Sequence, residues 1–195
     1  MRVISGKRRG AKLISPNDEM QVRPTTDRVK ESVFNLIQFD LGDSFLDLFA
    51  GTGQMGIEAI SRGVEKVCFC EHDAYTAELV KANLKKTGFT DSAEVTVGDS
   101  IAFLKKTDKK FKTVFVDPPY EKGLSQRALE MLGRDDSCVR DDGLVVVESK
   151  NGEEFPDDDD NHNKYTRSAE FLEDCPRFCA RISHRHSIYT VRNSL

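Results

Sequence analysis

From residue 44 onward, two patterns of hydrophobic positions alternate along the chain. Short apolar runs, the last three rich in valine, predict strands at 44–49, 66–71, 93–97, 113–116 and 144–148. Segments with apolar residues at helical spacing separate them and predict helices at 56–61, 74–86, 101–105 and 124–132. Strands separated by helices are typical of a parallel sheet with helices on both faces. The pattern therefore predicts an α/β fold.

The first forty residues follow a different pattern. Two apolar pairs, Val3-Ile4 and Leu13-Ile14, flank a turn bounded by glycines and predict a hairpin over 1–14. After a turn-prone linker, apolar residues recur at helical spacing from Val29 to Ile37. This helix has three candidate N-cap residues, Thr25, Thr26 and Asp27. We therefore expect an N-terminal extension over 1–40 and a larger domain over 41–195.

The end of the chain is less regular. An acidic loop over 153–163 includes four consecutive aspartates at 157–160, which repel one another and bury no apolar surface. Short closing strands are expected near Ile182 and over 187–191.

The bulk composition excludes several classes of protein. The chain has 195 residues, of which 38% are hydrophobic, enough for one domain with a small appendage. No apolar run reaches the roughly 18–20 residues that span a bilayer, and no apolar stretch follows the basic N-terminus as in a secretory signal. Five cysteines, an odd number, favour reduced thiols. We expect a cytoplasmic monomer that binds no membrane.

Charge is distributed unevenly. The net charge is −4, but residues 1–30 hold eight basic residues against three acidic ones. A basic end on a neutral body can bind phosphates locally, whatever the total charge. We assign RNA binding to Lys7, Arg8, Arg9, Lys12, Arg23 and Arg28. The alternative is a solvated hairpin whose charge has no partner.

A glycine-rich loop follows the first strand of the larger domain. The sequence Gly51-Thr52-Gly53-Gln54-Met55-Gly56 matches G-x-G-x-x-G between a strand and a helix. Glycines there let the backbone approach a ligand closely beside the N-terminus of a helix. Taken alone, this motif is a weak signal, because several nucleotide-binding proteins carry it.

Acidic residues at three successive strand ends sharpen the prediction. Asp47 precedes the loop, where a carboxylate suits the cationic amino group of S-adenosylmethionine (SAM) better than a pyrophosphate. Glu71 ends the next strand, where it can accept both hydroxyls of a ribose, and Asp99 can accept from an adenine amino group. The predicted cofactor residues here are Asp47, Ala50, Gly51, Thr52, Gly53, Glu71, His72, Asp99 and Ser100.

Two alternatives compete with a SAM site. NAD binding would suit Glu71 but neither Asp47 nor the turn described next. Each acid could instead cap a helix, since a carboxylate accepts readily from the N–H groups of a first turn.

The fourth strand ends in Asp117-Pro118-Pro119-Tyr120. Two prolines cannot continue a strand, so they fix a rigid turn at the carboxyl edge of the sheet. Asp117 and the Pro118 carbonyl can accept the two N–H groups of an aromatic amine, and Tyr120 can stack on the base that carries it. A paired base must first leave its helix. The alternative is a purely structural turn with a core tyrosine.

These motifs resemble those of the RsmD-type family of rRNA methyltransferases. The resemblance covers roughly residues 1–150. It rests on the hairpin sequence at 6–13, on Arg23-Pro24-Thr25-Thr26-Asp27-Arg28, on the glycine loop with Glu71, and on the Asp-Pro-Pro-Tyr turn. The turn also occurs in adenine-N6 methyltransferases, whereas the hairpin and the Arg-Pro-Thr-Thr-Asp-Arg segment are more specific. The acidic run and the tail from 161 to 195 depart from the family pattern.

The resemblance implies a Rossmann-like SAM-dependent methyltransferase fold, which we expect as a seven-stranded, mostly parallel sheet with an N-terminal hairpin and helix extension. It implies SAM as cofactor and methylation of guanine N2 in small-subunit (16S) rRNA, within an assembling small ribosomal subunit. It also places Thr25, Thr26 and Arg28 close to SAM or the target base.

Two other functions remain open from the sequence. The chain could methylate adenine N6 or another amino group, since Asp117 does not decide the base. It could also be an RNA-binding assembly factor without catalytic activity, although all four acids of the site are present.

Cysteine and histidine residues near the C-terminus allow a further interpretation. Cys175, Cys179, His184 and His186 could bind zinc, but the His-x-His spacing is tight for the usual pattern. Alternating strand histidines with cysteines as small apolar residues are the simpler interpretation, so we predict no metal. Cys68 and Cys70 alternate on one strand and are expected to be buried.

Overall fold

A computed structural model describes residues 1–16, 25–119, 123–150, 166–168, 178–182 and 187–193. The acidic loop, Arg23, Tyr120, Cys175, His184 and His186 lie outside these residues. The predictions for these residues remain predictions from the sequence.

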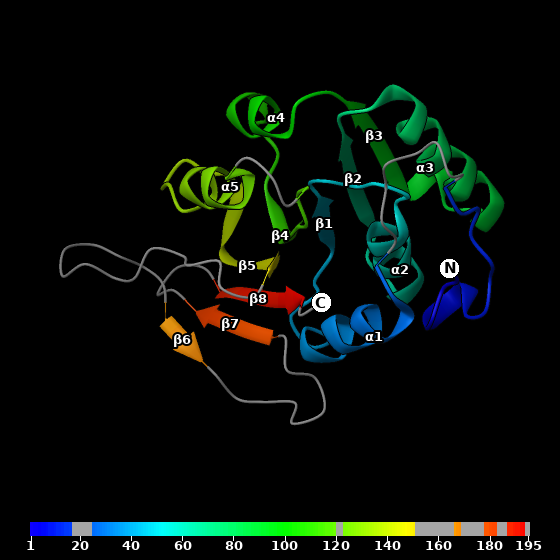
Figure 1. Ribbon diagram of the computed structural model, residues 1–195, viewed down its shortest axis with the longest axis horizontal. Helices are drawn as coiled ribbons and strands as arrows, with labels where there is room; N and C mark the ends of the chain where they lie inside the picture. Colours follow the sequence, from blue (N-terminus) through cyan, green and yellow to red (C-terminus); the bar gives the residue numbers. More distant parts are fainter. Residues whose placement is uncertain (17–24, 120–122, 151–165, 169–177, 183–186, 194–195) are drawn as a thin grey trace.

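The described strands form one sheet in the order β3-β2-β1-β4-β5-β8-β7-β6 (Figure 1). The first five strands in this order, from β3 through β2, β1 and β4 to β5, are parallel to one another, and β8 runs parallel to β5. β7 is antiparallel to β8, and β6 is antiparallel to β7. The strands are β1 (Ser44–Asp47), β2 (Lys66–Glu71), β3 (Ala93–Val97), β4 (Phe111–Val116), β5 (Val139–Lys150), β6 (Thr166–Ser168), β7 (Phe178–Ile182) and β8 (Ser187–Asn193).

The prediction of an α/β Rossmann-like fold is confirmed, but the expected seven strands were wrong. Eight strands occur among the described residues, and five of them make up the parallel part that carries the helices. The sequence suggested two closing strands in the tail, and the structure has three there. The short β6 has no strong apolar pattern, and only its pairing with β7 defines it.

Helices cover both faces of the sheet. Apolar residues of α1 (Asp27–Leu36), α2 (Gln54–Arg62) and α3 (Ala74–Thr87) pack against Phe45, Phe69 and Phe115 on one face. Residues of α4 (Ser100–Lys106) and α5 (Leu124–Leu132) pack against Leu46, Val114 and Val145 on the other. Adjacent strand residues point to opposite faces, so both faces of the central strands are apolar.

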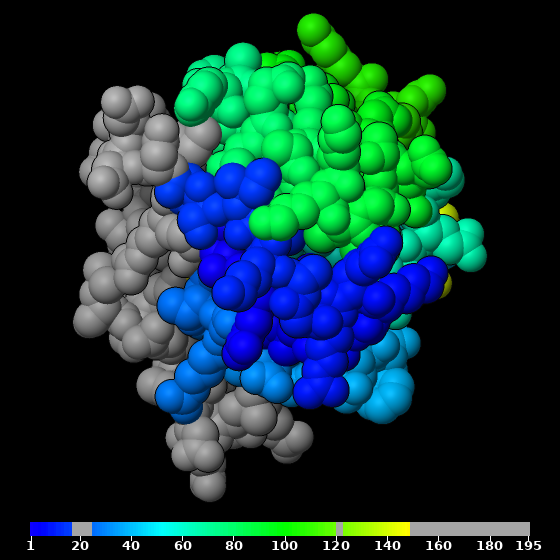
Figure 2. Space-filling view, turned by 90° about the vertical axis from the view of Figure 1, so that its right-hand side faces the viewer, coloured from blue at the N-terminus to red at the C-terminus, as the bar shows by residue number. Residues whose placement is uncertain are grey.

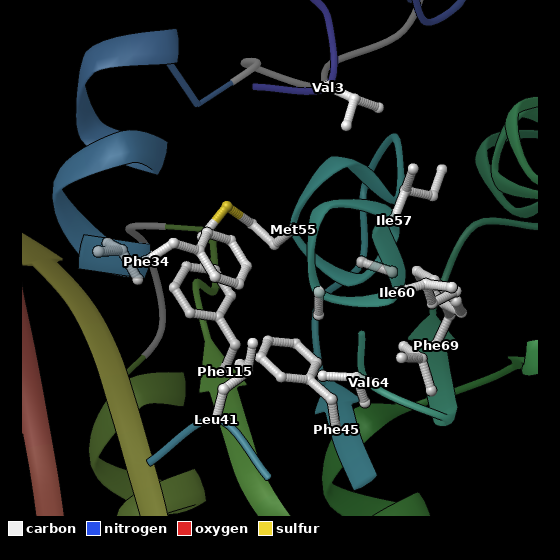
Figure 3. Close-up of a cluster of buried hydrophobic side chains, with 14 of the residues drawn as sticks. Val3, Phe34, Leu41, Phe45, Met55, Ile57, Ile60, Val64, Phe69 and Phe115 are labelled. Atoms are coloured by element: carbon white, nitrogen blue, oxygen red, sulfur yellow. The ribbon is translucent and has the colours of Figure 1, made fainter. Parts of the chain in front are cut away.

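Aromatic residues anchor α1 to the sheet. Phe34 of α1 and Phe45 of β1 are fully buried, and their rings stack with centroids 6.4 Å apart (Figure 3). Val3 and Leu13 belong to the same cluster of buried residues, so the first forty residues share a hydrophobic core with the sheet. The division of the chain at residue 40 remains a prediction about folding units.

The N-terminal residues form the predicted hairpin. Val3 N–H donates to the Ala11 carbonyl at 2.9 Å, Gly10 N–H donates to the Val3 carbonyl at 2.8 Å, and Arg2 bridges Lys12 in antiparallel fashion. A short 3-10 turn, η1 (Gly6–Arg8), forms the tip, and a second one, η2 (Thr90–Ser92), follows α3.

A buried carboxylate holds the hairpin against α2. Glu58 accepts hydrogen bonds from the backbone N–H groups of Ile4 and Ser5, at 2.7 and 3.0 Å, and from Arg62 Nε at 2.8 Å. Lys30, also fully buried, donates to the Arg2 carbonyl at 2.6 Å, and burial lowers its pKa. Each buried charge is thus met in part by hydrogen bonds to the backbone of the docked hairpin.

Among the residues that the structure describes, none of the helices has both the length and the apolar character required to cross a bilayer.

Candidate active site

Carboxylate residues end three adjacent strands on the same face of the sheet. Asp47 pairs in register with Phe69 of β2 and Phe115 of β4. Glu71 and Asp117 follow those two phenylalanines by two positions, and side chains two positions apart lie on one face of a strand. Parallel strands also bring their carboxyl ends to one edge. The sheet therefore gathers Asp47, Glu71 and Asp117 beside the glycine loop, as the sequence predicted for this edge.

Asp47 is the most strongly perturbed of these acids. Its side chain is 1% exposed, and its Oδ2 accepts from the Gly56 N–H at 2.9 Å. Burial raises the pKa of Asp47 to about 8, the hydrogen bond from Gly56 opposes this, and the charges of Asp117 and Glu71 add to it. A carboxyl group with so high a pKa is poised for a cationic partner, which would favour its ionised form.

Glu71 connects β2 to the glycine loop. Its Oε2 accepts from the Gly51 N–H at 2.8 Å, and its Oε1 accepts from the Asp73 N–H at 3.0 Å. A carboxylate has about four acceptor positions, so both oxygens can still accept from ligand hydroxyls. Glu71 thus fixes the loop backbone while remaining able to bind a ribose.

The loop conformation depends on its glycines. Gly53 has φ +75° and precedes the first residue of α2, and a Cβ there would lie 2.9 Å from Val80. A Cβ on Gly56 would lie 2.2 Å from the Phe69 ring, so this glycine lets α2 pack closely against β2. The third glycine of the motif therefore serves packing, and the first two shape the loop.

Asp99 takes the capping role that the sequence left open. Its Oδ1 accepts from the Ala102 N–H at 2.7 Å and caps α4. Asp99 still lies at this end of the sheet. Burial raises the pKa of Cys70 to about 11, and the nearby charges of Glu71, Asp99 and Asp47 add to this effect. Ser100 is buried, and its hydroxyl donates to the Leu48 carbonyl at 2.7 Å, so it supports the end of β1.

The remaining predicted cofactor residues differ in their surroundings. Thr52 is buried, and its hydroxyl donates weakly to the Met1 sulfur at 3.4 Å. Thr26 caps α1 by accepting from the Val29 N–H at 3.3 Å, as its sequence position predicted. Thr25 is half-buried, whereas His72 is exposed on the surface after β2.

The Asp-Pro-Pro turn follows β4 directly. Asp117 is half-buried, Pro118 is buried and Pro119 is exposed. Leu48 N–H donates to the Phe115 carbonyl at 3.0 Å and fixes the end of β1 beside this turn. The backbone therefore presents Asp117 and the Pro118 carbonyl at the same edge as the glycine loop.

The described basic residues of the predicted RNA surface are all exposed. They are Lys7, Arg8, Arg9 and Lys12 of the hairpin and Arg28 of α1. Hairpin and helix thus place positive charge on the outside of the molecule.

Two residues near the site were not assigned from the sequence. Glu148 is 3% exposed near the end of β5, and continuing the register of Val116 with Val147 places it beside Asp117. Its position directly after the apolar run at 144–147 could have identified Glu148 from the sequence, because the same kind of position identified Asp47. Asn83 of α3 donates to the Thr52 carbonyl at 3.1 Å, a link that no sequence pattern indicates.

Comparisons with known proteins identify relatives of this chain. The family model described as "Conserved hypothetical protein 95" matches residues 1–170. Ribosomal RNA small subunit methyltransferase D of Escherichia coli is 38% identical over 77% of this chain and 75% of its own length. YlbH of Bacillus subtilis, named as a candidate rRNA methyltransferase, is 41% identical over 80% of this chain and 86% of its own length.

The chain belongs to the RsmD-type family. As a member of this family it is a methyltransferase, which sets aside the NAD alternative. A solved structure of yhhF, a candidate methyltransferase of Escherichia coli, superposes with a TM-score of 0.66 at 33% identity and covers 74% of this chain and 77% of its own.

Proposed function

We propose that this RsmD-type chain transfers a methyl group from SAM to the exocyclic N2 amino group of a guanine in small-subunit rRNA. The observation that carries the proposal is the alignment of Asp47, Glu71 and Asp117 on one face at the carboxyl edge of the sheet. The substrate class comes from relatives named ribosomal RNA small subunit methyltransferase D.

The residues at this edge suit SAM chemically. Asp47 pairs a buried carboxyl group of raised pKa with the positive amino group of the ligand. Glu71 receives the ribose hydroxyls, and the glycine loop leaves room for close approach of the backbone. When bound, SAM supplies a methyl group on a positively charged sulfur. We further assign Ala50, Thr52, His72, Asp99, Ser100, Thr25 and Thr26 to its surroundings.

The Asp-Pro-Pro turn orients the nucleophile. Asp117 and the Pro118 carbonyl accept the two N–H groups of the amine and direct its lone pair toward the methyl carbon. Such positioning contributes roughly 7–11 kcal/mol in favourable cases. With SAM bound, the N–C bond would form as the methyl–sulfur bond breaks and a neutral thioether leaves, and Asp117 would accept the proton that the methylated amine loses, a contribution of typically ~10²–10⁴ in rate. We assign Tyr120 to stacking on the base.

The substrate RNA lies against the basic N-terminal extension in this proposal. Lys7, Arg8, Arg9, Lys12 and Arg28 are exposed and suited to phosphate, and Arg23 joins them by sequence. We propose that a cytoplasmic monomer acts on the assembling subunit. The free thiols Cys68, Cys70 and Cys138 are compatible with a reducing compartment.

The test uses the purified chain, methyl-labelled SAM, and rRNA or small-subunit particles from cells that lack this protein. Digestion to nucleosides should yield N2-methylguanosine, and sequencing should map it to one position. Labelled N6-methyladenosine would refute the guanine assignment. RNA binding without any methyl transfer would support an assembly factor instead. An Asp117→Ala preparation serves as the control for contaminating activity.

A further inference from the structure

We propose that Lys85 and Lys86, at the end of α3, form a second phosphate-binding surface with Lys7, Arg8 and Arg9 of the hairpin. This distal basic surface would hold an RNA segment other than the one that carries the target base. The inference rests on the proposed RNA substrate and extends it to residues and a region that the active site does not include.

The tip of the hairpin lies at the far end of α2 from the glycine loop. Gly6 is so close to α2 that a Cβ on it would lie 1.8 Å from the Ser61 carbonyl oxygen. Arg8 N–H donates to the Ser61 hydroxyl at 3.0 Å. Because α2 begins at the loop and has nine residues, its far end is about 13 Å away at 1.5 Å per residue. The basic tip therefore lies at the opposite end of α2 from the glycine loop, where the target base is proposed to bind.

The end of α3 lies next to this tip. A Cβ on Gly88, the C-cap of α3, would lie 2.9 Å from Arg8 Nη2, so the guanidinium group lies over the end of the helix. Lys85 and Lys86 in the last turn are both exposed. Figure 2 shows the blue surface of the N-terminal residues adjoining the green surface of α3 and the segment after it. The two groups of basic residues thus share one face.

Nearby acidic side chains do not neutralise this surface. Glu58 is buried and is paired with Arg62, and Glu78 is paired with Lys81 at 2.6 Å. Asp91, on η2 beyond Gly88, and Glu65, shortly after α2, are exposed, so two acids stand against five basic residues. A face with this excess of positive charge suits the phosphates of a nucleic acid.

The surface is fixed relative to the active site. Glu58 holds the backbone of Ile4 and Ser5, and Ser61 holds the tip, so the hairpin is docked along the length of α2. Because the distance between the distal basic surface and the active site is fixed, an RNA must span that distance to contact both. The distal surface would therefore favour folded rRNA over short single strands.

Lysines in a last helical turn also interact favourably with the helix dipole, so their presence alone does not indicate a binding site. The chain offers a matched control for this effect. Lys105 and Lys106 occupy the last turn of α4, are equally exposed, and belong to the opposite face of the sheet (Figure 1). Charge reversal there changes the net charge by the same amount and likewise places acidic residues in a last helical turn.

The experiment compares Lys85→Glu/Lys86→Glu with Lys105→Glu/Lys106→Glu in binding to folded small-subunit rRNA over a salt series. The α3 variant should lose at least about tenfold in affinity at low salt. The slope of log affinity against log salt concentration should become less steep by roughly 1–2, as expected for one or two lost phosphate contacts. The α4 variant should stay within about twofold of the parent. Thermal unfolding should show that both variants are folded.

Methyl transfer gives a second readout. The α3 variant should lower kcat/KM for folded rRNA by the same factor as affinity, while kcat at saturating RNA and the Kd for SAM stay unchanged. Equal losses in the α3 and α4 variants, or an unchanged salt slope, would overturn the proposal. So would intact RNA affinity with weakened binding to subunit particles, which would indicate an acidic protein partner. Failure of the proposed function would instead leave the parent protein without methyl transfer, and the salt series would still decide the distal surface.

Discussion

Asp47 and Asp117 lie at the ends of adjacent parallel strands, and the negative charge of Asp117 contributes to the raised pKa of Asp47. Burial is the larger cause, and the hydrogen bond from Gly56 only partly opposes it. The ionised form of Asp47 is therefore costly without a ligand. A bound cation would remove that cost. The buried carboxylate therefore lowers the stability of the free protein and raises its affinity for a positive group.

Asp47→Asn should stabilise the protein at neutral and higher pH and weaken SAM binding. The folded pKa of about 8 lies above the ordinary aspartate pKa of 3.8, so the folded state binds more protons and the parent loses stability as pH rises between these values. The advantage of the variant should grow from about pH 4 to about pH 8 and then level off. Urea unfolding across this range checks the trend, and calorimetry checks the loss of SAM affinity. If the difference in stability between Asp47→Asn and the parent were the same at all pH values, the raised pKa of Asp47 would be contradicted.

Asp117→Ala should abolish transfer with little effect on SAM affinity. We expect kcat to fall by about 10²–10⁴, because the amine loses both an orienting acceptor and a proton acceptor. Single-turnover transfer and calorimetry separate the two effects. Removal of the Asp117 charge should also lower the pKa of Asp47. A large loss of SAM binding would mean that Asp117 belongs to the cofactor site instead.

Local pattern predicted most of the parallel sheet. The bounds of β2, β3 and α5 agree with the expected ranges, because each has a clear apolar period and a definite end. The strand over 139–150 is much longer than predicted. Arg140, Asp141 and Asp142 interrupt its apolar run, and pairing with β4 and β8 extends it. Pairing of this kind depends on residues far away in sequence.

The candidate site was predictable where strand ends carry its residues. Asp47, Glu71 and Asp117 follow from one rule about parallel sheets. The contacts that support them were not predictable. Glu58, Lys30 and Asn83 lie within helices, where polar residues usually face solvent, and their contacts with the docked hairpin help to explain why they are buried. Asp99 also shows that a carboxylate at the site edge of the sheet can cap a helix.

Gly6→Ala should undock the hairpin, whereas Gly10→Ala should not. Both glycines have positive φ, +79° and +84°, so each substitution carries a similar backbone strain of about 1–3 kcal/mol. A Cβ on Gly6 would also collide with the Ser61 carbonyl, while nothing lies within 4 Å of one on Gly10. Urea unfolding should show a clearly larger loss for Gly6→Ala, and that variant alone should lose RNA affinity. Equal losses would mean that strain outweighs the contact with α2.

Asn83→Ala should weaken SAM binding from a position behind the glycine loop. Asn83 Oδ1 accepts from the Ile14 N–H at 2.7 Å, and its Nδ2 donates to the Thr52 and Ile14 carbonyls at 3.1 and 3.2 Å. Removal of the amide leaves the buried Thr52 carbonyl without this partner, at a cost of about 1–3 kcal/mol, and also removes the part-buried hydrogen bonds to Ile14. The loop at Thr52 would lose its support, so the Kd for SAM should rise severalfold.

Thr87→Val is the matched control for Asn83→Ala. Thr87 is buried one turn later in α3, and its hydroxyl donates only to Asn83 and Leu84 carbonyls of the same helix. This variant should lose some stability while keeping its SAM affinity. If calorimetry gives the same SAM affinity for both variants at matched fractions of folded protein, Asn83 has a purely structural role. A selective loss in Asn83→Ala would establish that the end of the hairpin at Ile14 and the glycine loop are coupled through one side chain.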